Sequence, residues 1–329
     1  MTATAPSPAS PAAQPTAPPA APSVVLREVG PRDGLQNEAR LLPLEEKQEL
    51  IRRLLAAGLR HIEIGSFVSP KAVPQMADTD QLCRTVPRPP GVVYTGLVLN
   101  ARGYDRAAAA GVDAVNLALA VTETFNRRNQ GAAPGESMAV FRDLVQRARA
   151  DGKACSITLG TAFGCPFEGE VPEGTVLRFV EQAAGFGVEL ITLADTIGVA
   201  VPTQVVRLVR AARRVAGPDV AIGCHFHNTR NTGLANAYAA LEEGAALLDA
   251  SVGGTGGCPF APRATGNIAT EDLVYMLERM GVATGVDLEA LIAAARWLEE
   301  RLGHPLDGQV MKSGPFPSRT AAPAAGGEG

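Results

Sequence analysis

The sequence predicts an α/β protein, a (β/α)8 TIM barrel with an extra C-terminal helical segment. Short apolar or β-branched runs alternate with segments of helical period, which is typical of parallel βαβ units. Eight such runs are present, and eight is the number at which a parallel sheet closes into a barrel. Polar side chains gather where the runs end, as they do in barrels of this kind. A doubly wound open sheet is the alternative architecture.

The strands and helices alternate along the whole central part of the chain. The predicted strands are 24–29, 60–67, 92–99, 113–120, 154–163, 189–195, 220–227 and 246–253. Predicted helices between them include 44–58, 136–152, 172–187 and 203–217. Several of these segments end in glycine, the residue that most easily adopts the left-handed conformation that closes a helix. A further helix over 287–303 is expected to pack on the barrel.

The chain divides into one large domain and two tails. Of the 329 residues, the first 23 contain no charged side chain, so 1–23 is predicted to be a disordered Ala/Pro-rich tail. No later linker divides 24–312, which is therefore expected to be a single catalytic domain. Residues 313–329 are expected to form a second disordered tail. The first segment has neither the Arg-rich pattern of a transit peptide nor a secretory core.

Composition excludes several classes of function. The chain is 46% hydrophobic, yet no apolar run approaches the length of about 18 residues that spans a bilayer, so no membrane is expected as a partner. A net charge of −4 without a long basic run argues against nucleic acid as a partner. Five irregularly spaced cysteines make no disulfide framework, which favours a reducing, cytoplasmic setting.

The segment CHFHN over 224–228 indicates a metal site. His225 and His227 are two apart on a predicted strand, so both side chains point to the same face. Asp33, at the end of the first strand, and Asn267, in the last loop, would add oxygen ligands. Such a mixed set suits Mg²⁺ or Mn²⁺, and less well Co²⁺. The alternative is that two structurally satisfied histidines end a strand by chance.

Other polar residues mark the ends of strands one, two and six. Arg32, next to Asp33, presents a fixed cation suited to a substrate carboxylate or a developing enolate oxygen. As a surface residue it would make only a weak ion pair with Glu28. The remaining strand-end residues are, in order of sequence, Glu63, Ser66, Asp195 and Thr196.

A glycine-rich loop, GGTGG over 253–257, precedes Cys258. With so few side chains the loop can open and close, and its thiol could enter the site as a proton donor or acceptor. A phosphate-binding glycine loop or a packed turn are the alternatives. The other four cysteines are expected to be buried and inert.

Seven segments together resemble the 3-hydroxy-3-methylglutaryl-CoA lyase family, within the metal-dependent lyase TIM barrels. They are VGPRDGLQNE (29–38), IEIGSFVSPKAVPQM (62–76), FGCPFEG (163–169), LADTIGV (193–199), CHFHN (224–228), SVGGTGGCPFAPRATGN (251–267) and ATEDLVYMLERMG (269–281). They occur in order from about Val25 to Gly303. RDGLQNE and SFVSPK are specific to the lyase branch, whereas HxH and the opening RDG are shared more widely.

The resemblance implies a role for each strand-end residue. A divalent Mg²⁺ or Mn²⁺ would be held by Asp33, His225, His227 and Asn267. Arg32 would stabilise the enolate of departing acetyl-CoA, and Cys258 would transfer a proton from the loop. The supporting residues would be Glu28 and Glu63, which orient Arg32 and the ligands, Asp195, a candidate base near the substrate hydroxyl, and Ser66 and Thr196, which contact substrate.

The resemblance further implies an acyl-CoA substrate, 3-hydroxy-3-methylglutaryl-CoA, cleaved to acetyl-CoA and acetoacetate in leucine degradation and ketone body metabolism. A homodimer is the expected assembly. The chain departs from the family pattern at Asn228, where aspartate is usual, in GTGGCPF for GLGGCPY, and in ITLGTAFGCPF for VSCALGCPY. These changes leave a citramalyl-CoA-type substrate open. A Claisen-type synthase like isopropylmalate or homocitrate synthase, and a catalytically silent binding barrel, are the alternative functions.

Overall fold

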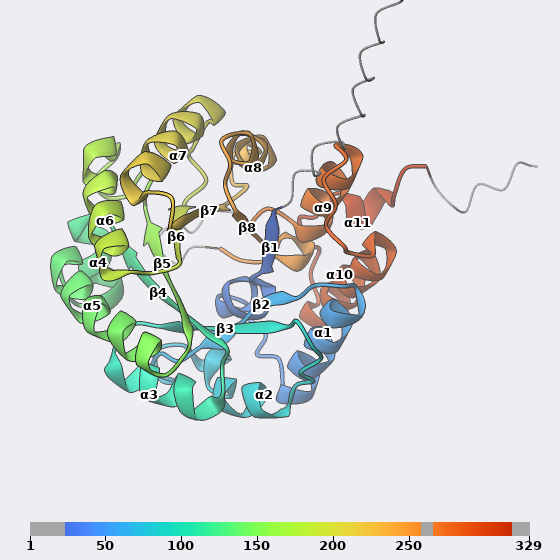
Figure 1. Cartoon of the computed structure of the whole chain (residues 1–329). Coiled ribbons are helices and arrows are strands. Elements are labelled where there is room, and N and C mark those ends of the chain that lie inside the picture. Colours follow the sequence, from blue (N-terminus) through green and yellow to red (C-terminus); the bar gives the residue numbers. More distant parts are fainter. Residues whose placement is uncertain (1–23, 258–265, 318–329) are drawn as a thin grey trace, which may run out of the picture.

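The computed structural model describes residues 24–257 and 266–317. The tail 1–23, most of the tail 313–329 and Cys258 therefore lie outside the described residues. Eight parallel strands close into a barrel in sequence order, with helices around it (Figure 1). This confirms the predicted fold and excludes the doubly wound open sheet, because β1 pairs with β8 as well as with β2.

The elements alternate as the sequence predicts. The strands are β1 Val25–Glu28, β2 His61–Ser66, β3 Val93–Val98, β4 Ala114–Ala120, β5 Ala154–Gly160, β6 Leu190–Asp195, β7 Ala221–Phe226 and β8 Leu247–Ala250. The helices are α1 Leu44–Ala56, α2 Thr79–Thr85, α3 Ala101–Ala110, α4 Glu123–Gln130, α5 Pro134–Ala150, α6 Glu173–Phe186, α7 Pro202–Ala216, α8 Gly233–Glu242, α9 Thr270–Arg279, α10 Leu288–Leu302 and α11 Val310–Ser313.

Two strands end three residues earlier than expected. Strand β5 ends at Gly160 because Thr161 has a φ of 55°, which breaks the extended backbone. Strand β8 ends at Ala250, and a short helical turn follows over Val252–Gly254, where Gly253 has a φ of 70°. Both of these strand ends lie at the carboxyl end of the barrel, so the chain turns sooner at this rim than its apolar pattern suggests.

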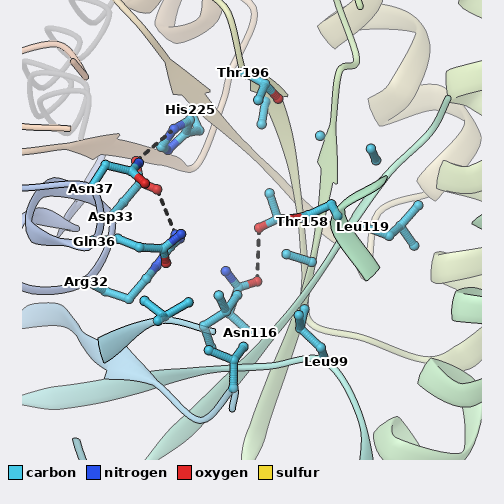
Figure 2. Close-up of a pocket in the computed structure, with 18 of the residues that line it drawn as sticks. Arg32, Asp33, Gln36, Asn37, Leu99, Asn116, Leu119, Thr158, Thr196 and His225 are labelled. Carbon is cyan, nitrogen blue, oxygen red and sulfur yellow. Dashed lines mark hydrogen bonds and ion pairs between the residues drawn. The ribbon is translucent and has the colours of Figure 1, made fainter. Parts of the chain in front are cut away.

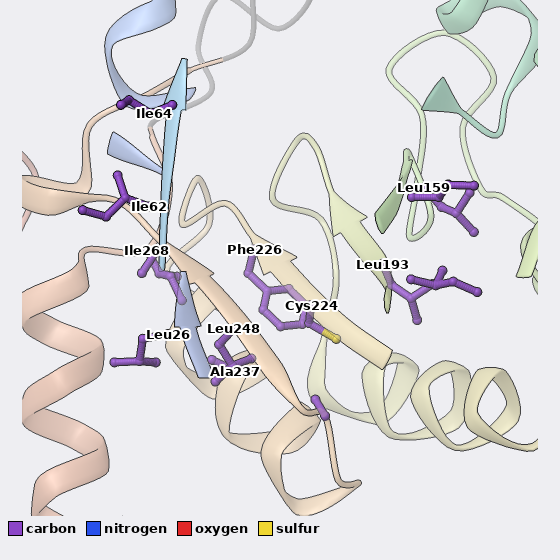
Figure 3. Packing of buried hydrophobic residues seen from close by; sticks show 14 of the residues in the cluster. Leu26, Ile62, Ile64, Leu159, Leu193, Cys224, Phe226, Ala237, Leu248 and Ile268 are labelled. Atoms are coloured by element: carbon purple, nitrogen blue, oxygen red, sulfur yellow. The ribbon is translucent and has the colours of Figure 1, made fainter. Parts of the chain in front are cut away.

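The outer face of the barrel is apolar and packs against the helices. Leu26, Ile62, Leu193, Phe226 and Leu248 are buried on this face (Figure 3). Alternate residues on the same strands point inward, and many of these are polar. The inward-facing residues include Arg27, Glu63, Asn116, His225 and Asp249, all buried. The inside of this barrel is therefore a polar network, where barrels commonly pack branched apolar side chains.

Helix α10 is the predicted extra C-terminal helix. It begins after Asp287, whose carboxylate accepts hydrogen bonds from the backbone N–H groups of Glu289 and Ala290, and ends at Gly303 with a φ of 79°. Its apolar face packs against α1 and the turn after β8. Among the described residues, no helix combines the length and apolarity needed to cross a membrane.

Candidate active site

A cavity of about 260 Å³ opens at the carboxyl ends of the barrel strands. Figure 2 shows Arg32, Asp33 and His225 on one side of it and Leu119 and Thr158 across from them. The charged residues come from the turn after β1 and from β7. The turn, Gly30–Gly34, is wound as a single π-helical turn, a distortion that frequently occurs at functional sites.

Asp33, His225 and His227 meet at the edge of this cavity. The Oδ2 atom of Asp33 lies 3.8 Å from Nε2 of His225 and 3.8 Å from Nε2 of His227, and the three ligand atoms lie within 4.8 Å of one another. Ligand atoms bound at about 2.1 Å to one octahedral cation are separated by about 3 to 4 Å. The triad therefore fits a divalent cation with little movement of the side chains.

Asn267 joins the triad from the loop before α9. A backbone bridge pairs it with His227, and its Nδ2 atom donates hydrogen bonds to Oδ2 of Asp33, at 2.8 Å, and to the carbonyl oxygen of Thr255, at 3.0 Å. Its Oδ1 atom is buried and accepts no hydrogen bond within the described part of the chain. An unsatisfied acceptor beside this triad suits a cation, and the role of Asn267 as a ligand stays a prediction.

Arg32 is held between two carboxylates. Its Nη1 atom donates to Oδ1 of Asp33 at 2.7 Å, and its Nε atom donates to Oε2 of Glu63 at 2.5 Å. Burial by itself would raise the pKa of Asp33, but Arg32, the two histidines and Asn267 outweigh it and lower this pKa to about 2. Asp33 is therefore ionised at neutral pH, as a metal ligand must be.

Glu63 is in turn anchored by residues that the sequence interpretation missed. The side-chain amide of Asn116 donates to Oε1 of Glu63 at 3.0 Å, and its Oδ1 atom accepts from Ser156 and Thr158. The signal was present, because Asn116 interrupts the otherwise apolar strand AVNLALA. A polar residue inside a buried strand needs a partner, and here the partner orients Arg32 through Glu63.

Glu28 makes no hydrogen bond or ion pair with Arg32, which it was expected to orient. It faces the outside of the barrel, where its carboxylate accepts hydrogen bonds from the backbone N–H groups of Gly30 and Val252 and from the hydroxyl of Thr270. Burial raises its pKa to about 7, although the three hydrogen bonds oppose the shift. Glu28 thus ties the turn after β1 to the turn after β8, and the glutamate that holds Arg32 is Glu63.

Asp195 also faces away from the cavity. Its two carboxylate oxygens accept hydrogen bonds from the backbone N–H groups of Val199 and Ala200, each at 2.9 Å, and its side chain is fully buried. Strand alternation brings its neighbours Ala194 and Thr196 to the cavity instead. The structure therefore does not support Asp195 as a base at the substrate hydroxyl, and gives it the role of bracing the β6–α7 loop.

The remaining strand-end residues differ in their placement. Thr196 lines the cavity, and its hydroxyl accepts a hydrogen bond from the backbone N–H of Thr161. Ser66 is buried at the end of β2, and its hydroxyl has no hydrogen-bond partner among the described residues. Contact of either residue with substrate stays a prediction, as does the role of Cys258, which lies outside the described residues. The other four cysteines are free and buried, as predicted.

Much of the cavity wall was not anticipated. Gln36 and Asn37, in the motif GLQNE, and Asn129, from α4, add polar groups at the rim. Much of the remaining cavity wall is apolar. These apolar residues are Val68, Ala72, Val73, Leu97, Leu99, Ala118, Leu119, Ala120 and Phe125. We call these nine residues the apolar wall; nothing in their sequence distinguishes them from ordinary core residues.

The sequence of this chain is similar to the sequences of known proteins over most of its length. A model of the HMGL-like family matches residues 23–298. An (R)-citramalyl-CoA lyase of Chloroflexus aurantiacus is 49% identical over 304 residues, covering 89% of this chain and 95% of that protein. A hydroxymethylglutaryl-CoA lyase of Bacillus subtilis is 43% identical over 293 residues, covering 88% and 98%.

A solved structure shares the fold as well. An HMG-CoA lyase from Acinetobacter baumannii, in complex with coenzyme A and 3-methylmalate, superposes with a TM-score of 0.87 at 42% identity, covering 92% of this chain and 98% of that one. The matches extend over the whole barrel and the residues of the candidate site. The chain therefore belongs to the HMGL-like family.

Proposed function

We propose that this chain is a metal-dependent carbon–carbon lyase that releases acetyl-CoA from a 3-hydroxy-3-methylacyl-CoA thioester. The observation that carries the proposal is the Asp33–His225–His227 triad with Arg32 fixed beside it in one cavity. Relatives named (R)-citramalyl-CoA lyase and hydroxymethylglutaryl-CoA lyase support the reaction class. The solved relative with bound coenzyme A supports a thioester substrate.

The reaction breaks the bond between C2 and C3 of the acyl chain. The C3 hydroxyl loses its proton and its oxygen becomes the carbonyl of an oxo acid, while the bonding electrons pass to C2 as a thioester enolate. Protonation of C2 then gives acetyl-CoA. A divalent cation, held by Asp33, His225, His227 and Asn267, would act as a Lewis acid toward the substrate hydroxyl.

Arg32 would stabilise the negative charge that appears on the thioester oxygen. Two of its nitrogens, Nε and Nη1, are bound by Glu63 and Asp33, which fixes the plane of the guanidinium. Nη2 makes no hydrogen bond with the described residues and is left to face the substrate. A donor that is positioned before the charge develops needs no reorganisation during the reaction.

Two substrates remain candidates, and they differ by one methylene. 3-Hydroxy-3-methylglutaryl-CoA, which the sequence resemblance predicts, would yield acetoacetate; (R)-citramalyl-CoA would yield pyruvate. The second is favoured by the relative that is 49% identical. It is also favoured by the departure from the family pattern in ITLGTAFGCPF, since Thr158 and Gly160 of this segment line the cavity.

A coupled acetyl-CoA release assay with both thioesters, in Mg²⁺ and in Mn²⁺, tests the proposal. We expect release from at least one of them, with equal amounts of the matching oxo acid. A Claisen-type synthase would instead condense acetyl-CoA with a 2-oxo acid and release free coenzyme A. Absence of both reactions in protein that binds Mn²⁺ would favour a binding barrel.

Cys258 is proposed to deliver the proton to C2 from the glycine-rich loop. Its Cys258→Ala variant should fold normally and lose most of its turnover. Cys83→Ala is the matched control, because Cys83 is buried in α2 and does not line the cavity. Equal turnover of the two variants would contradict a role for Cys258 in proton transfer.

The homodimer, the cytoplasmic location and the place in leucine degradation and ketone body metabolism expected from the sequence are also proposals. Light scattering on purified protein distinguishes a dimer from a monomer. Preference for (R)-citramalyl-CoA in the release assay would contradict the two metabolic assignments.

A further inference from the structure

A buried ion pair lies behind one histidine of the triad. The Nε and Nη2 atoms of Arg27 donate to Oδ1 and Oδ2 of Asp249, at 2.8 and 2.9 Å. Oδ2 of Asp249 also lies 3.1 Å from Nδ1 of His225. Arg27 and Asp249 are each only 3% exposed, so the contacts are shielded from water. A continuous chain of charge-assisted contacts therefore runs from Arg27 to His225.

The barrel itself sets this alignment. In the strand register Arg27 of β1 is directly opposite Asp249 of β8, and Asp249 is directly opposite His225 of β7. All three side chains point inward from regular, hydrogen-bonded strands. No loop has to order for the contact to form, which is the arrangement that holds functional groups most firmly.

The contact determines which nitrogen of His225 faces the site. A neutral imidazole has one N–H donor and one acceptor nitrogen. With Nδ1–H donating to Asp249, the lone pair lies on Nε2, the atom that points toward Asp33 across 3.8 Å. A carboxylate placed in this way fixes both the tautomer and the orientation of a metal-binding histidine.

Arg27 holds the carboxylate of Asp249 in place. Asp249 lines the catalytic cavity, and a carboxylate free to rotate there could turn toward a cation and away from the histidine. The two-pronged contact with Arg27 holds the plane of the carboxylate and balances its charge. Arg27 itself lines a second cavity, of about 300 Å³, at the amino ends of the strands. The ion pair thus separates the two cavities.

We propose that Arg27 and Asp249 are positioning residues that hold His225 in the tautomer and orientation needed for metal binding. The inference rests on the proposed metal site and adds two residues that would act on it through His225. Arg27 can be changed from the far end of the barrel, where no residue of the catalytic cavity is altered.

The test is Mn²⁺ affinity, measured by calorimetry on the full chain without substrate. We expect Asp249→Asn to weaken binding by about 10- to 100-fold, the range found when such supporting partners are removed. Arg27→Met should weaken it by about tenfold, within the same range, and Arg27→Lys should restore part of the loss because it keeps the charge. Should Asp249→Asn fail to fold, the two Arg27 variants carry the test.

Lys47→Met is the matched control. Lys47 makes another ion pair, with its buried Nζ atom 2.7 Å from Oδ1 of the partly buried Asp78, and neither residue lines the catalytic cavity. This variant should lower the melting temperature without changing Mn²⁺ affinity. If the Arg27 and Asp249 variants behave in the same way, the pair is merely structural and the inference is wrong.

A second measurement separates this inference from the metal proposal. The chain has four histidines, so nitrogen NMR of histidine-labelled, metal-free protein at alkaline pH can identify the tautomer of His225. We expect the Nδ1–H form in the wild type and its loss in Asp249→Asn. Failure of the wild type to bind Mn²⁺ would overturn the metal site, whereas an Nε2–H form in the wild type would overturn the inference alone.

Discussion

The two sides of the catalytic cavity are built on different principles. On one side, Arg32, Asp33 and His225 are charged or polar, and each has hydrogen-bond partners on neighbouring elements. On the other side, Leu99 and Leu119 belong to the apolar wall and are positioned by packing alone. We therefore expect the charged side to determine which bond breaks and the apolar wall to determine which acyl group fits.

The two sides should therefore respond differently to substitution. A change on the charged side leaves a buried group without its partner, which is costly and affects every substrate alike. A change on the apolar wall alters the volume available to one part of the substrate and leaves the reacting groups in place. Three experiments test this difference, and a fourth tests Glu28, a buried carboxylate outside the cavity.

Removal of the metal should have the largest effect. The charged side holds a carboxylate and two imidazoles close together, an arrangement that a cation would complete. Treatment with a chelator should reduce turnover below detection, and Mg²⁺ or Mn²⁺ should restore it. Circular dichroism of the treated protein provides the control for folding. Full turnover in excess chelator would show that the triad serves another purpose.

Arg32→Gln should have the next largest effect. Loss of the cation removes stabilisation of the enolate, and we expect kcat to fall by about 10²- to 10³-fold with little change in KM. Arg40→Gln is a control, since Arg40 is exposed and its guanidinium pairs with Glu46 on the surface. Steady-state kinetics distinguish the outcomes: a defect confined to KM would reassign Arg32 to substrate binding.

On the apolar wall, Leu99→Ala should change selectivity more than rate. The extra space should favour the longer 3-hydroxy-3-methylglutaryl chain over the citramalyl chain, shifting the ratio of their kcat/KM values by about tenfold. Val98→Ala is the matched control, because Val98 is the preceding residue and faces the helices. An equal loss for both thioesters would mean that Leu99 does not contact the acyl group.

Glu28→Gln should have the smallest effect on turnover and a measurable effect on stability. Because burial raises the pKa of Glu28 from 4.5 to about 7, the folded protein binds this proton more tightly than the unfolded chain. The contribution to stability is present below about pH 4.5 and is lost as the pH rises through 7, by about 3 kcal/mol.

A glutamine at position 28 does not titrate, so the variant should lose less stability than the wild type between pH 5 and 8. Its amide can still accept from Gly30 and donate to the hydroxyl of Thr270, the partners of the native carboxylate. Urea unfolding at several pH values measures the difference. Parallel curves for the two proteins would show that Glu28 does not titrate in this range.

The charged side was largely predictable because its signals are local. His225 and His227 are two residues apart on a strand, and this spacing alone places them on one face. Asp33 directly follows the first strand and therefore lies at the same rim of the barrel. The apolar wall carried no such signal, since Leu99 and Leu119 resemble the core residues of any α/β protein.

The residues that position the charged side were harder to foresee. Asn116 is 53 positions from Glu63, and Asp249 is 222 positions from Arg27, yet each pair is in contact. Such contacts depend on strand register, which a single sequence does not specify. The same applies to Glu28 and Asp195, whose place at strand ends suggested the cavity although their side chains face outward.

The sequence by itself determined the order of strands and helices, the barrel, and the residues at the ends of its strands, because hydrophobic period and strand alternation act over a few residues. Closure of the barrel decided the rest. Bringing β1 beside β8 joins residues more than 200 positions apart, and the resulting register selects which polar groups share a buried space. Buried polar groups must find partners, so this selection gave His225 its aspartate and Arg32 its glutamate.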